Sequence, residues 1–270
     1  MVETDDDRTE RFAHAFDDTA ANFDELGAYL WRPIGAATVE ATRPAEGERV
    51  LDACCGNGAS ALPAAHLVGS RGTVDAVDLS EILLEQLAQR ANALPQLATH
   101  RADVTAWEPN GYDIVHCALG IFFFPDMTAG TEHLISRARP GGRVGLTIWR
   151  RGAVEQASEH LLLALQRVVG IDPEPRPDHL IYRVNEPEAF ERWLTELGLH
   201  DVAVVEHELR VPMTPEVAWL VIVGSGFVAM LAGLDSEQVA EVRTAYLRSL
   251  AEAGVTVLDA TTLIGTGVRL

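Results

Sequence analysis

The strongest constraint on the fold is a regular alternation of short apolar runs and helical spacing in the first half of the chain. Apolar runs occur at 49–53, 72–77, 112–118 and 143–149, and helical spacing follows the first of them over 58–68. Apolar runs of this length are typical of buried strands. Strands that alternate with helices form a parallel sheet covered on both faces, so we expect an α/β, doubly wound fold.

Local signals place further elements around these strands. Ser80 is a suitable N-cap for a helix, and a third strand ends near Asp103. A helix over 131–138 is followed by the turn sequence "RPGG", which leads into the last of the four apolar runs. Beyond Arg150 the pattern becomes mainly helical. There we expect helices over 154–169, 187–197 and 236–253 and strands over 202–209 and 261–268.

Charge and composition limit the partners. Forty acidic residues against 21 basic ones give a net charge of −19, which repels nucleic acid phosphates and favours small-molecule chemistry. All the basic residues are arginine, which excludes chemistry on a lysine amine. Three cysteines and no charged-then-apolar leader indicate neither a disulfide framework nor a secretory signal, so we expect a reducing compartment, by default the cytoplasm.

One apolar segment, Val217–Leu234, has 18 residues without a charge and so reaches the lower length limit for a membrane span. Its centre is interrupted at Gly224-Ser225-Gly226, and neither flank carries clustered arginine. We therefore expect a broken, buried helix that packs over an apolar cavity, and no membrane span.

The turn between the first strand and the first helix, "LDACCGNG", is rich in glycine. Gly56 and Gly58 allow backbone N–H groups to approach a ligand. Asp78, at the end of the second strand, is placed to accept hydrogen bonds from the ribose of an adenosine-type cofactor. Asp52, at the end of the first strand, would repel a pyrophosphate and suits a cofactor that is cationic at this turn.

These motifs resemble those of class I S-adenosylmethionine (SAM)-dependent methyltransferases, in particular the small-molecule group similar to ubiquinone and menaquinone biosynthesis enzymes (methyltransferase domain 11/25 type). "VLDACCGNG" is similar to the first motif, with Cys54 where many members have glycine, and "VDAVDLS" resembles the second. "RADVTAW", "YDIVHCALGIFFFPD" and "ARPGGRVGLTIW" resemble the next three in order. The resemblance implies a Rossmann-like sheet of seven strands, six parallel and the last antiparallel, with helical lid elements.

The resemblance also implies how the chain is organised and where SAM binds. We expect a disordered acidic tail over 1–10, a helical cap over 11–48, a SAM-binding core over 49–150, and a region over 151–270 that completes the sheet and adds lid helices over the substrate. The implied cofactor-binding residues are Tyr29, Trp31, Asp52, Cys54, Gly56, Asn57, Gly58, Asp78, Leu79, Asp103, Val104, Cys117 and Ala118.

Methyl transfer by in-line displacement needs mainly positioning and exclusion of water, because the cofactor is already activated. If a general base is used, His116 is a candidate, although a lone histidine in an apolar strand is more often a core residue. His14 and His179 are equal alternatives, so the sequence identifies no base. The acceptor atom stays open between oxygen, nitrogen and carbon.

Aromatic residues crowd the segments around the expected site, which favours a small apolar or aromatic acceptor. Ordinary core packing explains about half of such a set, since aromatic side chains are often buried. Our candidates for contact with the acceptor are Phe16, Phe23, Phe122, Trp219 and Phe227.

Three other functions stay open. A nicotinamide-dependent oxidoreductase would use the same glycines and Asp78, but Asp52 argues against it. A non-catalytic binding or regulatory protein could keep the cofactor fold. Methylation of nucleic acid or protein is disfavoured by the charge and by the lack of an "NPPY"-like run after the fourth strand. Homodimer formation is open as well.

The adjacent cysteines Cys54 and Cys55 raise the question of thiol chemistry. Neighbouring cysteines seldom bridge each other, and no histidine or second cysteine pair lies at metal-ligand spacing, so we expect no metal. Cys117 belongs to a strand that lies beside the first, which leaves an oxidation-sensitive cluster as an alternative. We favour small, buried wall residues.

Overall fold

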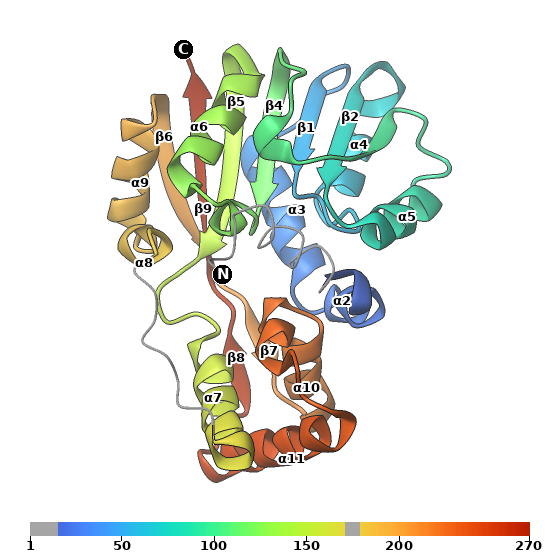
Figure 1. Cartoon of the computed structure of the whole chain (residues 1–270). Coiled ribbons are helices and arrows are strands. Elements are labelled where there is room, and N and C mark those ends of the chain that lie inside the picture. The colour runs from blue at the N-terminus through green and yellow to red at the C-terminus, as the bar shows by residue number, and fades with distance from the viewer. Residues whose placement is uncertain (1–15, 171–178) are drawn as a thin grey trace, which may run out of the picture.

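A computed structural model describes residues 16–170 and 179–270. The acidic tail expected at 1–10 and His14 lie outside these residues. A seven-stranded sheet forms the upper part of the molecule, and a smaller lobe lies below it (Figure 1). In spatial order the strands are β3 (Leu97–Arg101), β2 (Thr73–Asp78), β1 (Arg49–Ala53), β4 (Tyr112–Ala118), β5 (Ala138–Trp149), β9 (Thr262–Arg269) and β6 (Leu199–His207).

The strand directions confirm the predicted fold class. Strands β1 to β5 pair in parallel, whereas β9 pairs antiparallel with both β5 and β6. Six strands therefore share one direction, and the last strand of the sequence is inserted between β5 and the edge strand β6. The order reverses between β1 and β4, and in open α/β sheets ligands bind beyond the carboxyl ends of the strands at such a point.

Helices cover both faces of the sheet because side chains alternate along the strands. In β1, Val50 packs with one helical layer and Leu51 with the other. The first layer comprises α3 (Trp31–Thr42), α4 (Ala61–Val68) and α5 (Glu81–Arg90), and the second comprises α6 (Met127–Arg137) and α9 (Pro187–Glu196).

The lower lobe packs around a second apolar core, which it shares with Leu26 of α2 (Ala20–Leu26) and with Leu30 and Ile34. Its elements are α7 (Glu155–Val169), α10 (Pro215–Val223), the 3-10 helix η4 (Gly226–Leu231), α11 (Ser236–Glu252) and the ribbon of β7 (Arg210–Pro212) and β8 (Val257–Asp259). This lobe lies beyond the carboxyl ends of β1 and β4 (Figure 1).

The apolar segment Val217–Leu234 forms the broken, buried helix that its sequence predicts. α10 ends at Gly224, and the Ser225 hydroxyl accepts a hydrogen bond from Phe227 N at 3.3 Å to begin η4. No helix among the described residues is long and apolar enough to cross a membrane.

Several element boundaries differ from the expectations, and one ribbon was missed. α6 begins at Met127, before the predicted 131, because the Asp126 carboxylate caps it by accepting from Ala129 N at 2.9 Å. β5 begins at Ala138 and includes the "RPGG" sequence, with a shift of register opposite Tyr112. The β7–β8 ribbon was not predicted, since three residues ending in Pro212 show no strand pattern.

Candidate functional site

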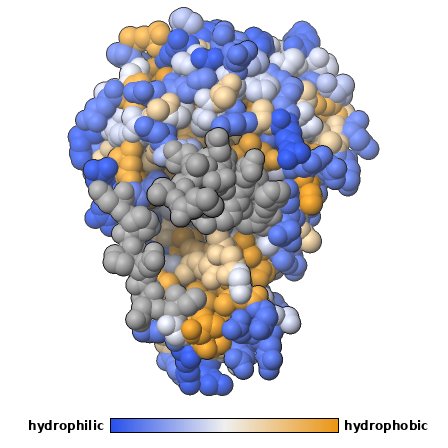
Figure 2. All heavy atoms as spheres, in the orientation of Figure 1, coloured by the Kyte–Doolittle hydropathy of each residue, from blue (hydrophilic) through white to orange (hydrophobic). Residues whose placement is uncertain are grey.

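A cavity of about 680 Å³ lies between the carboxyl ends of the strands and the lower lobe. In Figure 2 apolar residues border the hollow on the side of the lower lobe. The cavity brings together most of the residues that the sequence singles out. Those that line it are Phe16, Phe23, Trp31, Cys54, Gly56, Asn57, Asp78, Leu79, Asp103, Val104, Ala118, Phe122 and Phe227.

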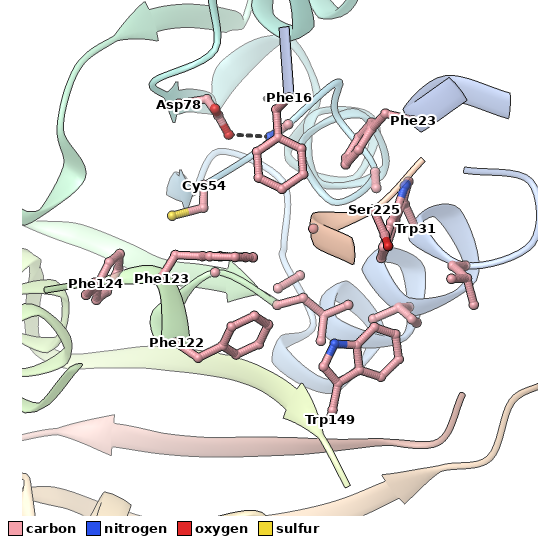
Figure 3. A pocket seen from close by; sticks show the side chains of 18 of the residues that line it. Phe16, Phe23, Trp31, Cys54, Asp78, Phe122, Phe123, Phe124, Trp149 and Ser225 are labelled. Carbon is pink, nitrogen blue, oxygen red and sulfur yellow. Dashed lines mark hydrogen bonds between the residues drawn. The ribbon is translucent and has the colours of Figure 1, made fainter. Parts of the chain in front are cut away.

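The glycine-rich turn and the end of β2 are joined through Asp78. Its Oδ2 accepts a hydrogen bond from Gly56 N at 2.8 Å, and its Oδ1 accepts one from Ser80 N at 2.9 Å (Figure 3). Burial raises the pKa of Asp78 above its usual value, and the backbone hydrogen bonds oppose that rise. Each carboxylate oxygen can accept two hydrogen bonds, so acceptor capacity is left for a ligand.

Gly56 and Gly58 serve different purposes in the turn. Gly56 has φ +51°, and a Cβ there would lie 3.2 Å from the Phe23 ring, within the cavity. Gly58 has φ +95° and does not line the cavity; a Cβ there would lie 2.3 Å from Leu87 Cδ1. A side chain at 56 would therefore occupy space in the cavity, whereas one at 58 would displace the Leu87 side chain of α5.

Asn57 ties the same turn to its neighbours. Its Nδ2 donates to Gln86 Oε1 of α5 at 3.1 Å and to Asp24 Oδ1 of α2 at 3.4 Å. Asp24 also forms an ion pair with Arg90 of α5. The helix α2 is thus held against the first turn of the cofactor motif by polar contacts.

Asp52 does not line the cavity, although we expected it to contact the ligand. It is fully buried on the α3 and α4 side of the sheet, where the Ser60 hydroxyl lies 2.9 and 2.8 Å from its two carboxylate oxygens. Burial raises its pKa to about 7, and the nearby charge of Asp78 adds to the rise. Strand alternation turns this side chain away from the cavity.

Asp52 should make stability depend on pH. A carboxyl group whose pKa is raised from 3.8 to about 7 on folding stabilises the fold most at low pH, and loses that contribution as pH rises through 7. Between pH 5 and 8 the wild type should therefore lose on the order of 2 kcal/mol relative to Asp52→Asn. Urea unfolding at both pH values measures this, and parallel pH profiles for the two proteins would contradict it.

The cysteines are free thiols packed around the turn. Cys54 has φ +55° and lines the cavity, and Cys117 lies behind it in β4. The contact between these two thiols, together with burial, raises the pKa of Cys54, and burial raises that of Cys55. Raised pKa values disfavour thiolates, which supports wall residues over nucleophiles. No cluster able to hold a metal occurs within 16–170 and 179–270.

Aromatic rings from two segments meet in front of the glycine turn. The ring of Phe16 packs edge-on against Phe23 at 5.8 Å and against Phe123 at 5.9 Å between centroids, and Phe23 stacks on Trp31 at 5.2 Å. Figure 3 shows these rings between Asp78 and the lower lobe. The segment before β1 therefore contributes aromatic side chains to the cavity wall.

The structure removes the candidate base His116 from the site. Its ring is fully buried, hydrogen-bonded through Nε2 to Thr42 of α3, and absent from the cavity lining. Burial lowers its pKa to about 3, with a further contribution from Arg143. His179 packs against Tyr182 and does not line the cavity either.

Two aromatic candidates also lie outside the cavity lining. Tyr29 is 39 % exposed on the surface. Trp219 packs against Tyr246 within the lower lobe, with its ring centroid 6.3 Å away and Arg243 beside it. Aromatic character alone did not indicate which side chains line the cavity. Tyr29 precedes the start of α3, and the face of α10 that carries Trp219 turns toward α11.

Sequence reasoning missed several polar and aromatic residues of the cavity wall. Trp149 is the last residue of β5 and Arg150 follows it. Asn185 follows α8 (Ile181–Val184). Trp149 was assigned only to a strand, and nothing in the sequence around Asn185 resembles a motif. For Trp149 and Arg150, their place at the carboxyl end of β5 was the one available signal.

The chain is similar to several known proteins. Residues 50–142 match a family model described as a methyltransferase domain. The chain is 30% identical over 179 residues to aklanonic acid methyltransferase DauC of Streptomyces sp. (strain C5), covering 63% of this chain and 81% of that protein. It is 32% identical over 136 residues to nocamycin O-methyltransferase of Saccharothrix syringae, covering 49% of each chain, so it spans about half the length of that relative.

A solved structure shares the fold. Phosphoethanolamine N-methyltransferase 2 of Haemonchus contortus, in complex with phosphomonomethylethanolamine and S-adenosylhomocysteine, superposes with a TM-score of 0.56 at 18% identity. The match covers 96% of this chain and 60% of that one.

Proposed function

Because the chain belongs to the SAM-dependent methyltransferase family, we propose that it transfers a methyl group from SAM to an oxygen of a small, largely apolar acceptor held in the cavity described above. It is an enzyme that uses SAM, and acceptors named for its relatives are small molecules. Oxygen as the acceptor atom rests on the O-methyltransferase named among those relatives.

The observation that carries the cofactor assignment is the pairing of Asp78 with the glycine turn. Gly56 has no side chain to fill the space before the turn, and the Asp78 oxygens keep acceptor capacity toward it. Ribose hydroxyls are donors that suit such a carboxylate. The cavity volume of about 680 Å³ lies within the usual range for small-molecule sites. These residues fit the cofactor.

We propose that Asp78 and Leu79 hold the ribose end, that Asp103 and Val104 lie beside the base, and that Cys54, Gly56 and Ala118 border the remainder. When bound, SAM supplies a methyl group already activated on a sulfonium. The chain's own part is to orient the acceptor and to exclude water, which Phe16, Phe23 and Trp31 support by covering the cavity. Within the described lining no histidine is available as a base.

The segment boundaries and partners remain proposals. We propose the segment before β1 as the cap and the region after Arg150 as the substrate lid. The net charge of −19 supports a partner other than nucleic acid, and three free thiols suit a reducing compartment such as the cytoplasm. Homodimer formation stays a prediction without structural support.

Titration calorimetry tests the cofactor assignment. S-adenosylhomocysteine and SAM should each bind at a single site, and NADH should give no binding heat, because the Asp78 carboxylate lies at the turn and the one cationic side chain of the described lining, Arg150, lies at the other end of the cavity from a pyrophosphate there. Binding of NADH in place of S-adenosylhomocysteine would overturn the proposal.

A further inference from the structure

Three N–H donors gather at the end of the cavity that lies away from the glycine turn. Trp149 ends β5, Arg150 follows it, and Asn185 follows α8; all three line the cavity. Backbone contacts hold them together, since Arg151 N donates to Asn185 O at 2.8 Å and Arg150 N donates to Thr261 O at 3.1 Å. Trp149 lies across the cavity from Asp78 (Figure 3).

Asn185 is the most buried of the three. Its side chain is only 7% exposed, and its Oδ1 accepts from Arg151 Nε at 3.4 Å. No acceptor for its Nδ2 amide group occurs among the described residues. Asn185 lines the cavity and its Oδ1 is paired with Arg151, so its amide N–H group is available to donate to an oxygen of a bound molecule.

Trp149 and Arg150 add donors and charge beside Asn185. The indole nitrogen of Trp149 faces the open part of the cavity near Phe122 (Figure 3), and it has no acceptor among the described residues. Arg150 is the sole cationic side chain in the described lining. Asp259 of β8 accepts from its Nη2 at 2.8 Å and Glu206 lies 3.8 Å from its Nε, so these carboxylates fix the guanidinium group and offset part of its charge. The N–H donors of all three residues together favour an oxygen acceptor, and a charged one most.

Large apolar side chains also contribute to this end of the cavity, together with one carboxylate. Phe122, Leu162 and Met230 line it, and Glu155 lies at the first turn of α7, where the helix dipole stabilises its negative charge. A ligand that fits must therefore be mostly apolar and carry an acidic oxygen at one edge.

We propose that Trp149, Arg150 and Asn185 form a subsite that binds an ionised acidic group of the methyl acceptor. The acceptor would then be an apolar or aromatic organic acid. This inference rests on the proposed methyltransferase function. The subsite anchors the acceptor by its acidic group and so fixes the orientation of the rest of the molecule in the cavity.

A matched pair of probes tests the subsite: 1-hydroxy-2-naphthoate, which carries a carboxylate, and 1-naphthol, which lacks it. Affinities for the full chain saturated with S-adenosylhomocysteine are measured by calorimetry. The wild type should bind the carboxylate probe about tenfold or more tightly than 1-naphthol, since hydrogen bonds to charged groups are worth that much.

Two variants remove donors while keeping shape. Trp149→Phe deletes the indole N–H, and Asn185→Asp replaces the amide N–H group by an oxygen; each should reduce the preference severalfold, with Asn185→Asp giving the larger loss through charge repulsion. If Asn185→Asp fails to fold, Trp149→Phe decides the question. The control Phe122→Leu should weaken both probes alike and leave their ratio unchanged.

The possible results distinguish failure of the subsite from failure of the proposed function. No binding of the carboxylate probe, equal wild-type affinity for both probes, or an unchanged preference in the donor variants would overturn the subsite. Failure of the wild type to bind S-adenosylhomocysteine would instead overturn the proposed function.

Discussion

Replacing Asp78 by alanine should weaken binding of S-adenosylhomocysteine about 100-fold or more, which corresponds to roughly 2.7 kcal/mol. The substitution removes the acceptors proposed for the ribose hydroxyls, and it also leaves Gly56 N and Ser80 N without their carboxylate partner. Hydrogen bonds to a charged group contribute about 1.5–3 kcal/mol, so the loss of several explains the size of the effect. Calorimetry on the folded variant measures it.

Glu81→Ala is the matched control. Glu81 is an exposed carboxylate at the start of α5 that pairs with Arg101 at 2.6 Å and does not line the cavity. Its loss should leave the affinity for S-adenosylhomocysteine within twofold, since exposed ion pairs contribute little. Equal affinities for Asp78→Ala and Glu81→Ala would show that Asp78 does not hold the cofactor.

The variant Gly35→Val should destabilise the protein by about 3 kcal/mol or more, or prevent folding, because overpacking against fixed backbone is costly. Gly35 lies within α3, where it packs against the turn before α4; a Cβ at this position would lie 2.5 Å from Ala59 C and 2.9 Å from Ser60 N. The helix would have to move away, and it carries Trp31 and Ile34 into the cavity. Cofactor affinity should therefore fall together with stability.

Ala36→Val is the control in the same helix. Ala36 is exposed, so the added methyl groups meet no backbone, and only the lower helix propensity of valine, roughly 0.5 kcal/mol, should be lost. Urea unfolding of both variants gives the comparison. Similar losses at positions 35 and 36 would mean that α3 does not depend on close contact with the turn.

The core of the fold could be predicted from the sequence because its signals are local. The strands β1 and β4 have the predicted bounds, and α7 and α11 agree within one residue at each end. Apolar runs, caps and glycine turns act within a few residues of the chain, so one sequence suffices to find them. The place of β9 between β5 and β6 came instead from the family resemblance.

What the sequence could not provide is the direction in which each side chain points. Asp52 and His116 lie at the predicted strand positions, but both side chains face α3 and α4 instead of the cavity. Trp149 and Asn185 carry no motif, and they come close only because the backbone after β5 hydrogen-bonds to Asn185 after α8. Such contacts join residues far apart in the chain, and no periodicity reports them.

A crystal structure of the chain with S-adenosylhomocysteine tests the central claim most directly. The ligand should lie in the cavity before Gly56, with its ribose hydroxyls donating to Asp78 and its vacant methyl position directed toward the end lined by Trp149 and Asn185. Electron density for the ligand outside this cavity, or a ribose that makes no contact with Asp78, would contradict the account.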